Sequence, residues 1–242
     1  MRLSFRPQLW PTLMAVPAFF VLLAMGSWQL ERLTWKSALI AERAERSSAA
    51  PVEFPILPLA LSAEERAGFE FRRATLTGSF LHERETYLAA RSPTGEPGYQ
   101  VMVPLLRADG SAVLVNRGFV PIERKDPATR APGQVRGVVK VEGLIRLTGR
   151  TAWFMPDNEP AKNMWFWVDL PALSRHLGFP EAAWLYLDAG PASNPGGWPK
   201  GGQTHLVLPN DHLQYAITWY ALALALAVIY VVYHRRPPEG AS

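Results

Sequence analysis

Two long stretches of the chain contain no charged side chain, one toward each end. The first runs from Pro7 to Leu30, and the second lies between His212 and Arg235. Each stretch exceeds about 20 residues, a length that crosses the roughly 30 Å hydrocarbon layer of a membrane when it forms a helix. We therefore predict transmembrane helices over residues 10–30 and 213–233.

The first helix is predicted to continue beyond its apolar run, to about residue 46, because apolar and charged side chains keep separate faces there with helical spacing. A cleaved signal peptide is the competing interpretation, since Ala24-Met25-Gly26 supplies small residues around a cut. The apolar run is too long for a signal peptide, and the helical pattern passes the cut. We therefore favour a membrane helix.

Residues 47–209 show a different pattern, in which short apolar, β-branched runs alternate with turns rich in Gly, Pro and Asp. Asp109-Gly110 is a hairpin signal, Ser62 with Glu65 predicts a capped short helix, and the charged, Pro-rich residues 122–134 are expected to form a loop. The predicted strands are 73–80, 85–91, 99–106, 112–120, 138–147, 163–169 and 183–187, and a short helix is predicted over 171–177. The expected fold class is an α+β membrane protein, in which two transmembrane helices flank a mostly antiparallel β domain.

Two crossings place both ends of the chain on one side of the membrane, and the flanking charges indicate which side. The basic residues outside the two runs are Arg2, Arg6, Arg235 and Arg236. These residues favour the cytoplasmic side for both ends of the chain. Arg32 and Lys36 oppose this orientation. They begin a connection of roughly 180 residues, however, and long domains translocate largely regardless of charge. We expect a bacterial inner membrane protein with cytoplasmic termini and a periplasmic domain, or a domain in the matching space of an organelle.

The composition excludes several classes of function. The net charge is only +4 and basic residues are not clustered, which argues against a nucleic-acid partner and leaves membrane lipid as the expected contact. The chain has no cysteine, so disulfides, thiolate catalysis and iron–sulfur ligation are excluded. No nucleophile elbow or phosphate loop occurs, and we expect no enzymatic activity. The carboxylates assigned to solvated loops are Asp157, Glu159, Glu181 and Asp188.

His212 is the histidine whose position is most informative, because it stands where the second apolar helix meets water. On a helix it shares one face with Tyr215 and Trp219. An imidazole there can be the axial ligand of a flat, metal-centred macrocycle that packs on the aromatic rings, or an interfacial residue in an aromatic belt. The residues alone favour the interfacial role. His82 fits turn packing at least as well as ligation. The histidines given no site are His176, His205 and His234.

Three segments, in order along the chain, resemble the surfeit locus protein 1 family. The first is Gly26-Ser27-Trp28-Gln29-Leu30-Glu31-Arg32-Leu33-Thr34-Trp35-Lys36, and the second is Val113-Leu114-Val115-Asn116-Arg117-Gly118-Phe119-Val120-Pro121. The third contains Asn210, then His212-Leu213-Gln214-Tyr215 and Thr218-Trp219-Tyr220. Gly78, Phe80 and His82 also fit, although Leu81 stands where an acidic residue is more usual.

This resemblance implies an assembly factor for haem–copper cytochrome oxidase that assists insertion of haem a. The implied partner is the large haem-bearing subunit of the oxidase, with the haem a synthesis machinery as a further partner. His212 would be a transient ligand of the haem iron, with Tyr215 and Trp219 lining the site. The alternatives are a cofactor-free membrane scaffold that stabilises an oxidase intermediate, and a membrane-anchored periplasmic enzyme.

The Asn116-Arg117-Gly118 stretch has no role that the resemblance defines. Glycine permits a bend or a close approach at the end of a strand. Arg117 has the geometry to bind a carboxylate or a haem propionate. A structural turn is the interpretation that we favour for this stretch.

Overall fold

The structure is a computed structural model, and it describes residues 4–56, 61–149, 151–179 and 185–236. The chain forms two compact units, one made of residues 1–42 and 206–242 and the other of residues 43–205. Arg2, Glu181 and the start of the predicted strand 183–187 lie outside the described residues.

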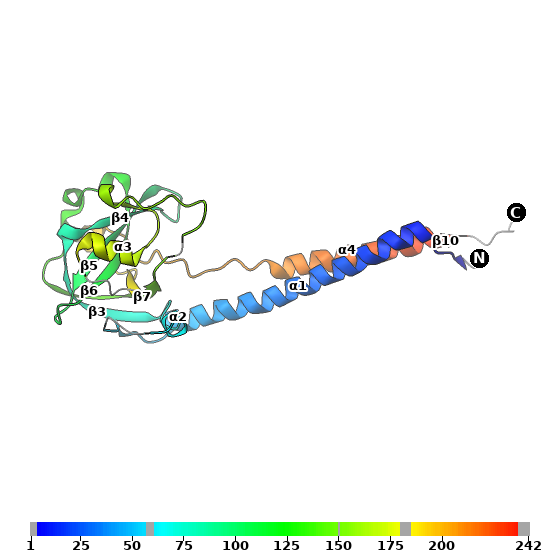
Figure 1. Cartoon of the computed structure of the whole chain (residues 1–242), viewed down its shortest axis with the longest axis horizontal. Coiled ribbons are helices and arrows are strands. Elements are labelled where there is room, and N and C mark those ends of the chain that lie inside the picture. The colour runs from blue at the N-terminus through cyan, green and yellow to red at the C-terminus, as the bar shows by residue number, and fades with distance from the viewer. Residues whose placement is uncertain (1–3, 57–60, 150, 180–184, 237–242) are drawn as a thin grey trace. The chain divides into compact units, whose positions relative to one another are not determined.

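The first unit is an antiparallel pair of long helices (Figure 1). The helix α1 spans Leu9–Ser48 and continues into the second unit, and α4 spans His212–His234. Both are long and apolar enough to cross a membrane, and little of either is buried within the structure. The short strands β1 (Ser4–Phe5) and β10 (Arg235–Arg236) pair antiparallel, at the N-terminal end of α1 and the C-terminal end of α4. The two described ends of the unit therefore lie on one side.

The two helices approach closely at Gly26. A Cβ atom on Gly26 would lie 2.7 Å from Cε1 of Tyr220, so only glycine leaves room for this ring. The Tyr220 hydroxyl group is 3.1 Å from the hydroxyl group of Ser27, and Thr12 and Tyr230 form a similar pair at 2.7 Å. These contacts fix the register of α4 against α1.

The second unit is a β domain with two short helices. Its strands are β2 (Val52–Glu53), β3 (Arg73–Phe80), β4 (Thr86–Arg91), β5 (Pro97–Leu106), β6 (Ala112–Pro121), β7 (Val138–Leu147), β8 (Met164–Trp165) and β9 (Leu185–Ala189). The helices are α2 (Ala63–Ala67) and α3 (Leu170–Leu177). The 3₁₀ turns are His82–Arg84, Ile122–Arg124, Pro127–Gly133, Pro160–Lys162 and Pro195–Gly197. The capping box of Ser62 and Glu65 is present at α2, as predicted.

The strands follow the order β2-β3-β7-β9-β6-β5-β4-β8, and β3 also pairs with β5. The strands β3, β7, β9, β6 and β5 therefore close into a ring of paired neighbours, in which β3 and β5 pair at two positions. The expectation of antiparallel pairing holds for the long pairs, but the sheet is mixed. The parallel pairs are β2–β3, β4–β8 and β6–β9. One of these is unavoidable, because β9 lies between two strands that run in opposite directions and must be parallel to one of them.

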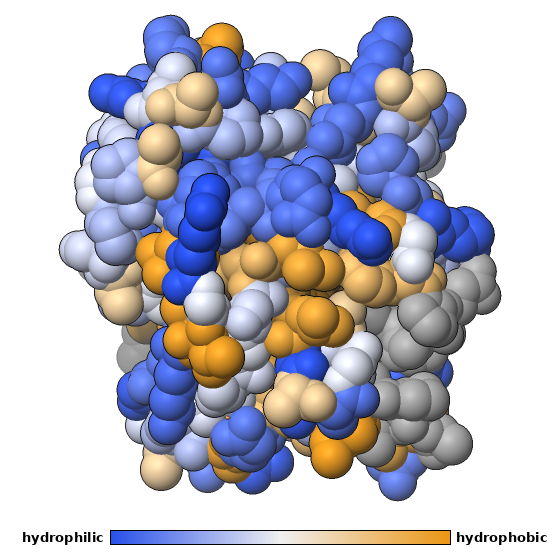
Figure 2. Space-filling model, turned by 90° about the vertical axis from the view of Figure 1, so that its left-hand side faces the viewer, coloured by the Kyte–Doolittle hydropathy of each residue, from blue (hydrophilic) through white to orange (hydrophobic). Residues whose placement is uncertain are grey.

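The core of the domain fills this ring. The side chains that form it are Phe54, Ala74, Leu76, Leu105, Val113, Val115, Ile145, Leu185 and Leu187. A second cluster forms where α3 packs on the sheet, and it includes Met102, Trp165, Leu170 and Leu173. The helix α3 begins after Asp169, whose carboxylate accepts from Ala172 N, and ends at Gly178 in the left-handed conformation. Hydrophobic side chains also reach the surface, and Figure 2 shows them gathered on one face among hydrophilic neighbours.

The predicted aromatic strand 163–169 is mostly wrong, since only Met164 and Trp165 pair with β4. The side chain of Asn158 explains the difference. Its Oδ1 accepts hydrogen bonds from the backbone N–H groups of Phe166 and Trp167, at 2.8 and 3.3 Å. Two donors that a neighbouring strand would need are therefore already occupied.

Gly118 is the position where the backbone tolerates a side chain least. Its φ is +113°, and a Cβ atom would collide with the carbonyl group of Lys200. The approach is close because Phe119 and Lys200 exchange two backbone hydrogen bonds, both 2.9 Å long. This agrees with a close approach at Gly118, but the favoured interpretation of a structural turn at a strand end is wrong, because Asn116, Arg117 and Gly118 all lie within β6.

Replacing Gly118 with alanine should therefore destabilise the domain by about 3 kcal/mol or more, from backbone strain and the collision together. The matched control is Gly110→Ala, because Gly110 has a φ of +83° but open space around it. The control should cost about 1–2 kcal/mol. Urea unfolding of the full-length protein, followed by tryptophan fluorescence, measures both values, and equal losses would contradict the collision.

Candidate functional site

His212 is the first residue of α4, and its ring contacts α1. Nδ1 of His212 lies 2.7 Å from Oε1 of Gln29. Gln29 is only 8% exposed although it is polar, so the contact replaces the hydrogen bonds that its amide would make with water. Asn210 donates to the hydroxyl group of Ser37 at 3.1 Å, about two turns further along α1. The start of α4 is therefore held to α1 by polar side chains.

The contact with Gln29 determines which nitrogen of His212 carries the hydrogen. An amide oxygen only accepts hydrogen bonds, so Nδ1 is the donor and the neutral ring has its lone pair on Nε2. Histidines that bind metals typically donate their other ring N–H to a carbonyl or carboxylate oxygen in this way. Nε2 itself makes no hydrogen bond within the described part of the chain.

Tyr215 and Trp219, the other two predicted site residues, follow His212 on the same helix. Their spacing of three and seven residues places all three along one face. Tyr215 is 56% exposed, and Trp219 is partly buried, with its Nε1 buried and without a hydrogen-bond partner among the described residues. The structure thus pairs His212 with Gln29 and leaves the aromatic rings beside it along α4.

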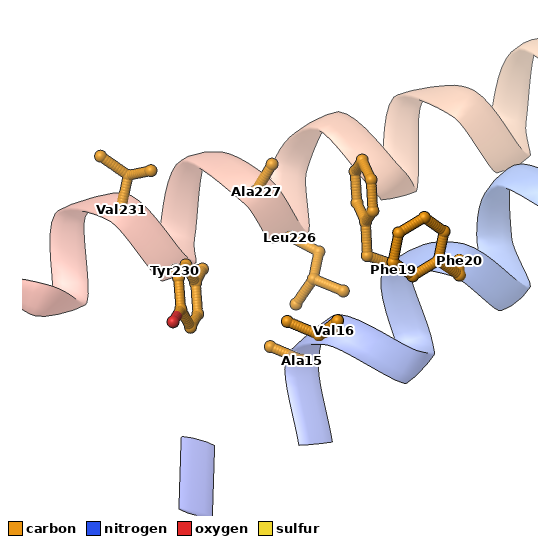
Figure 3. A pocket seen from close by; sticks show the side chains of 8 residues that line it. All are labelled: Ala15, Val16, Phe19, Phe20, Leu226, Ala227, Tyr230 and Val231. Carbon is orange, nitrogen blue, oxygen red and sulfur yellow. The ribbon is translucent and has the colours of Figure 1, made fainter. Parts of the chain in front are cut away.

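A separate apolar cavity of about 360 Å³ lies between α1 and α4 toward the β1–β10 end (Figure 3). Its lining residues are Ala15, Val16, Phe19, Phe20, Leu226, Ala227, Tyr230 and Val231. The nearest of these on α4 is fourteen residues beyond His212, which corresponds to about 21 Å along the helix. The cavity is therefore not part of the His212 site.

The other histidines occupy different surroundings. His82 Nε2 is 2.9 Å from the carbonyl oxygen of Val135, which agrees with turn packing. His205 is exposed, and the ring of His176 contacts Trp165. His234, predicted to have no site, is buried beside Phe5, Tyr230 and Tyr233.

The β domain contains a buried ion pair between Glu85 and Arg130. Two oxygens of Glu85 accept from Arg130, at 3.2 and 2.5 Å, and Gln134 donates a third hydrogen bond at 2.9 Å. Burial raises the pKa of Glu85, but the nearby His82 ring, 3.6 Å away, and the hydrogen bonds from Arg130 and Gln134 outweigh it and lower the pKa to about 2. Glu85 is therefore ionised at every physiological pH. Its role is structural, because it is buried and held by Arg130 and Gln134.

Asp188 forms a second polar cluster, so its assignment to a solvated loop is wrong. It lies on β9 and is buried. Its carboxylate accepts from Asn116, Arg146 and Thr204 at 2.9, 3.1 and 2.9 Å. The predicted strand ended at Leu187, one residue before Asp188, whereas β9 continues to Ala189. Of the other carboxylates, Glu159 pairs with Lys162.

No group of three or more histidine, aspartate or glutamate side chains within the described ranges is arranged to hold a metal ion. A metal at His212 would therefore need a ligand such as a porphyrin to supply its remaining donors.

Comparison with known proteins places this sequence in one family. It matches the SURF1 family over residues 16–224, which is most of the chain. The chain belongs to the SURF1 family. A SURF1-like protein of Monosiga brevicollis is 36% identical over 93% of this chain and 87% of its own length. Surfeit locus protein 1 of Homo sapiens is 37% identical, over 85% of this chain and 71% of its own length. Surfeit locus protein 1 of Takifugu rubripes is 36% identical, over 90% of this chain and 93% of its own length.

The SURF1 family match includes both His212 and the residue that sequence reasoning missed, Gln29. Gln29 lies within the first of the three segments that resemble the family, and His212 lies within the third. The sequence did contain a signal for Gln29, because a polar side chain inside an apolar helix needs a polar partner if the helix lies in a membrane. The partner could not be identified because the two positions are separated by 183 in sequence number.

Replacing Arg130 with methionine should destabilise this SURF1 family member by about 3–5 kcal/mol at pH 7, because Glu85 would keep a buried, unpaired charge. The folded-state pKa of Glu85, about 2, lies below its ordinary value of 4.5. The stabilisation is therefore complete above pH 4.5 and is lost as the pH falls toward 2. Arg91→Met, at an exposed arginine, is the control. Urea unfolding at pH 7 and pH 3 should show a smaller loss at pH 3, and a pH-independent loss would contradict the assignment.

Proposed function

We propose that this SURF1 family member is a non-enzymatic assembly factor for haem–copper cytochrome oxidase, which holds haem a through His212 before insertion into the large subunit. The observation that carries the proposal is the hydrogen bond from His212 Nδ1 to Gln29, which leaves the Nε2 lone pair free for iron.

The residues around His212 fit a porphyrin in their chemistry. A haem bound there would supply an iron centre that accepts the Nε2 lone pair. Gln29 holds the tautomer and the orientation of the imidazole. Tyr215 and Trp219 offer aromatic faces on the same side of α4, and the unpartnered Nε1 of Trp219 offers a hydrogen-bond donor.

The proposed location is the bacterial inner membrane, with α1 and α4 crossing it and both termini on the cytoplasmic side. The pairing of β1 with β10 supports one side for both ends. Basic residues beyond α4, such as Arg235, support the cytoplasmic side. The β domain would then face the periplasm, and His212 would lie at the outer surface of the membrane.

The proposed partners are the large haem-bearing subunit, which receives haem a, and the haem a synthesis machinery, which supplies it. Exposed apolar side chains on the β domain support a protein partner. Trp153 is 96% exposed and Phe154 is 71% exposed, and the centres of their rings are 5.8 Å apart. Two large exposed aromatic residues in contact are typical anchors of protein interfaces.

Changing His212 to alanine should remove at least about 90% of the haem that co-purifies with the protein, because the iron loses its protein ligand. The protein would be purified in detergent from cells that make haem a, and bound haem quantified by absorbance and extraction. His205→Ala, at an exposed histidine outside α4, is the matched control and should retain its haem.

Unchanged haem content in the His212→Ala protein would overturn the ligand assignment. A wild-type protein that never retains haem, yet co-purifies with the large subunit, would instead favour the cofactor-free scaffold.

Changing Gln29 to leucine should weaken haem binding by about 10–100-fold, because His212 loses the acceptor that orients its ring. Gln29→Glu keeps an oxygen acceptor at the same place and should restore binding. Haem titration of the purified apoprotein gives the affinities, and the absorbance spectrum reports the ligation state. Equal affinities for the leucine variant and the wild type would show that the hydrogen bond has no positioning role.

A further inference from the structure

Arg117 is a buried cation in the middle of β6, and it is only 2% exposed. Burial lowers its pKa to about 10, so the guanidinium group remains charged at neutral pH. Burying a charge is costly unless an opposite charge or a set of hydrogen bonds compensates for the lost water. The surroundings of Arg117 should therefore contain such compensation.

Two other arginines of the domain, the buried Arg130 and the partly buried Arg146, have this compensation. Arg130 binds Glu85, and Arg146 donates to Asp188 at 3.1 Å. Within the part of the chain that the structure describes, Arg117 forms no ion pair with any carboxylate. Arg130 and Arg146 are therefore paired directly with carboxylates, whereas Arg117 has only a coulombic interaction with Glu85, which already binds Arg130.

The hydrogen bonds of Arg117 are also incomplete. Both come from Nη2, to the carbonyl oxygen of Gly133 and to Oδ1 of Asn194, each 2.8 Å long. The guanidinium carbon lies 4.6 Å from the centre of the Phe80 ring, a cation–π contact. Nη1 is buried and has no hydrogen-bond partner among the described residues. An unsatisfied charged donor of this kind is typical of a site whose ligand is a separate molecule.

Arg117 lines a cavity of about 180 Å³, several times the roughly 30 Å³ of one water molecule. One part of the wall is aliphatic and consists of Val135, Val139 and Val141. The polar part of the wall includes Ser193, Asn194 and Lys140. Glu142 also lines the cavity, but its carboxylate is paired with Arg73. Arg117 is therefore the cation of the cavity, since strand alternation turns the exposed side chain of Lys140 to the other face of β7 from Val139 and Val141.

We propose that this cavity, which we call the Arg117 pocket, binds a carboxylate carried on a short aliphatic chain. The carboxylate would accept from the guanidinium group of Arg117, and the chain would pack against the three valines. Phosphate fits less well, because its oxygens need more donors than the pocket supplies, and the aliphatic wall offers nothing to a fully polar anion. The site lies within the β domain and is independent of His212 and of the proposed role in haem transfer.

The test uses the full-length protein in detergent and sodium butyrate as the probe. Butyrate should raise the midpoint of thermal unfolding in a saturable way, because it binds only the folded state. Sodium chloride at equal concentration tests for a general salt effect, and butyramide, which has nearly the same shape but no charge, tests the need for the carboxylate. Neither should reproduce the shift. A wild-type protein that responds equally to butyrate and chloride would overturn the proposal.

Three variants assign the binding to the pocket. Arg117→Met removes the charge and should weaken butyrate binding at least about tenfold. Ser193→Phe fills the cavity from an exposed position, leaves Arg117 in place and should weaken binding as much. Arg91→Met, at an exposed arginine outside the pocket, should bind as the wild type does. If Arg117→Met does not fold, Ser193→Phe decides the question. Wild-type affinity in Ser193→Phe, or in a folded Arg117→Met, would overturn the proposal.

Discussion

The close packing of α1 against α4 determines everything that we infer about His212. Gly26 lets the ring of Tyr220 approach the backbone of α1, and the hydroxyl pairs on either side of this contact fix the register. In this register Gln29 lies opposite His212. A shift of one residue would rotate α4 by about 100° and separate the two side chains. The chemistry of the imidazole therefore depends on a glycine that makes no contact with it.

The β domain contains buried polar groups inside the small barrel that its ring of five strands forms. Glu85 with Arg130 and Asp188 with Arg146 are complete pairs that tie distant segments together. Such pairs add little net stability compared with apolar side chains of equal size, but losing one member is costly. Arg117 departs from this arrangement, since it is buried as deeply as Arg130 but lacks a carboxylate. This difference within one domain distinguishes a structural charge from one that is available for a ligand.

Much of the secondary structure could be predicted from the sequence, because strands impose a two-residue repeat on the side chains and the two long helices coincide with uncharged apolar runs. Strands β3 and β7 have the predicted bounds, and α1 and α4 occupy the two uncharged runs. The repeat does not specify which strands become neighbours, so neither the insertion of β9 nor the pairing of β3 with β5 could be foreseen. Local side-chain hydrogen bonds also overrode the pattern, as Asn158 did at Phe166.

The candidate site was predicted less completely than the fold. His212 could be singled out because a polar residue at the edge of an apolar helix is conspicuous. Its partner Gln29 could not be identified, because a contact between two helices depends on their register, and no local pattern encodes it. The charged, Pro-rich residues 122–134 were expected to form a loop. That composition gave no sign that one of these residues, Arg130, is buried.

The position of β9 also has a consequence for the order of folding during synthesis. This strand completes the barrel by entering between β6 and β7, yet it is the last strand of the domain to leave the ribosome. Until residues 185–189 have emerged, β6 and β7 each lack a neighbour and their edges are open to incorrect pairing. Only about 20 residues separate β9 from α4, so the barrel closes shortly before the second long helix is complete. A nascent chain that stalls before this point would expose an unfinished sheet.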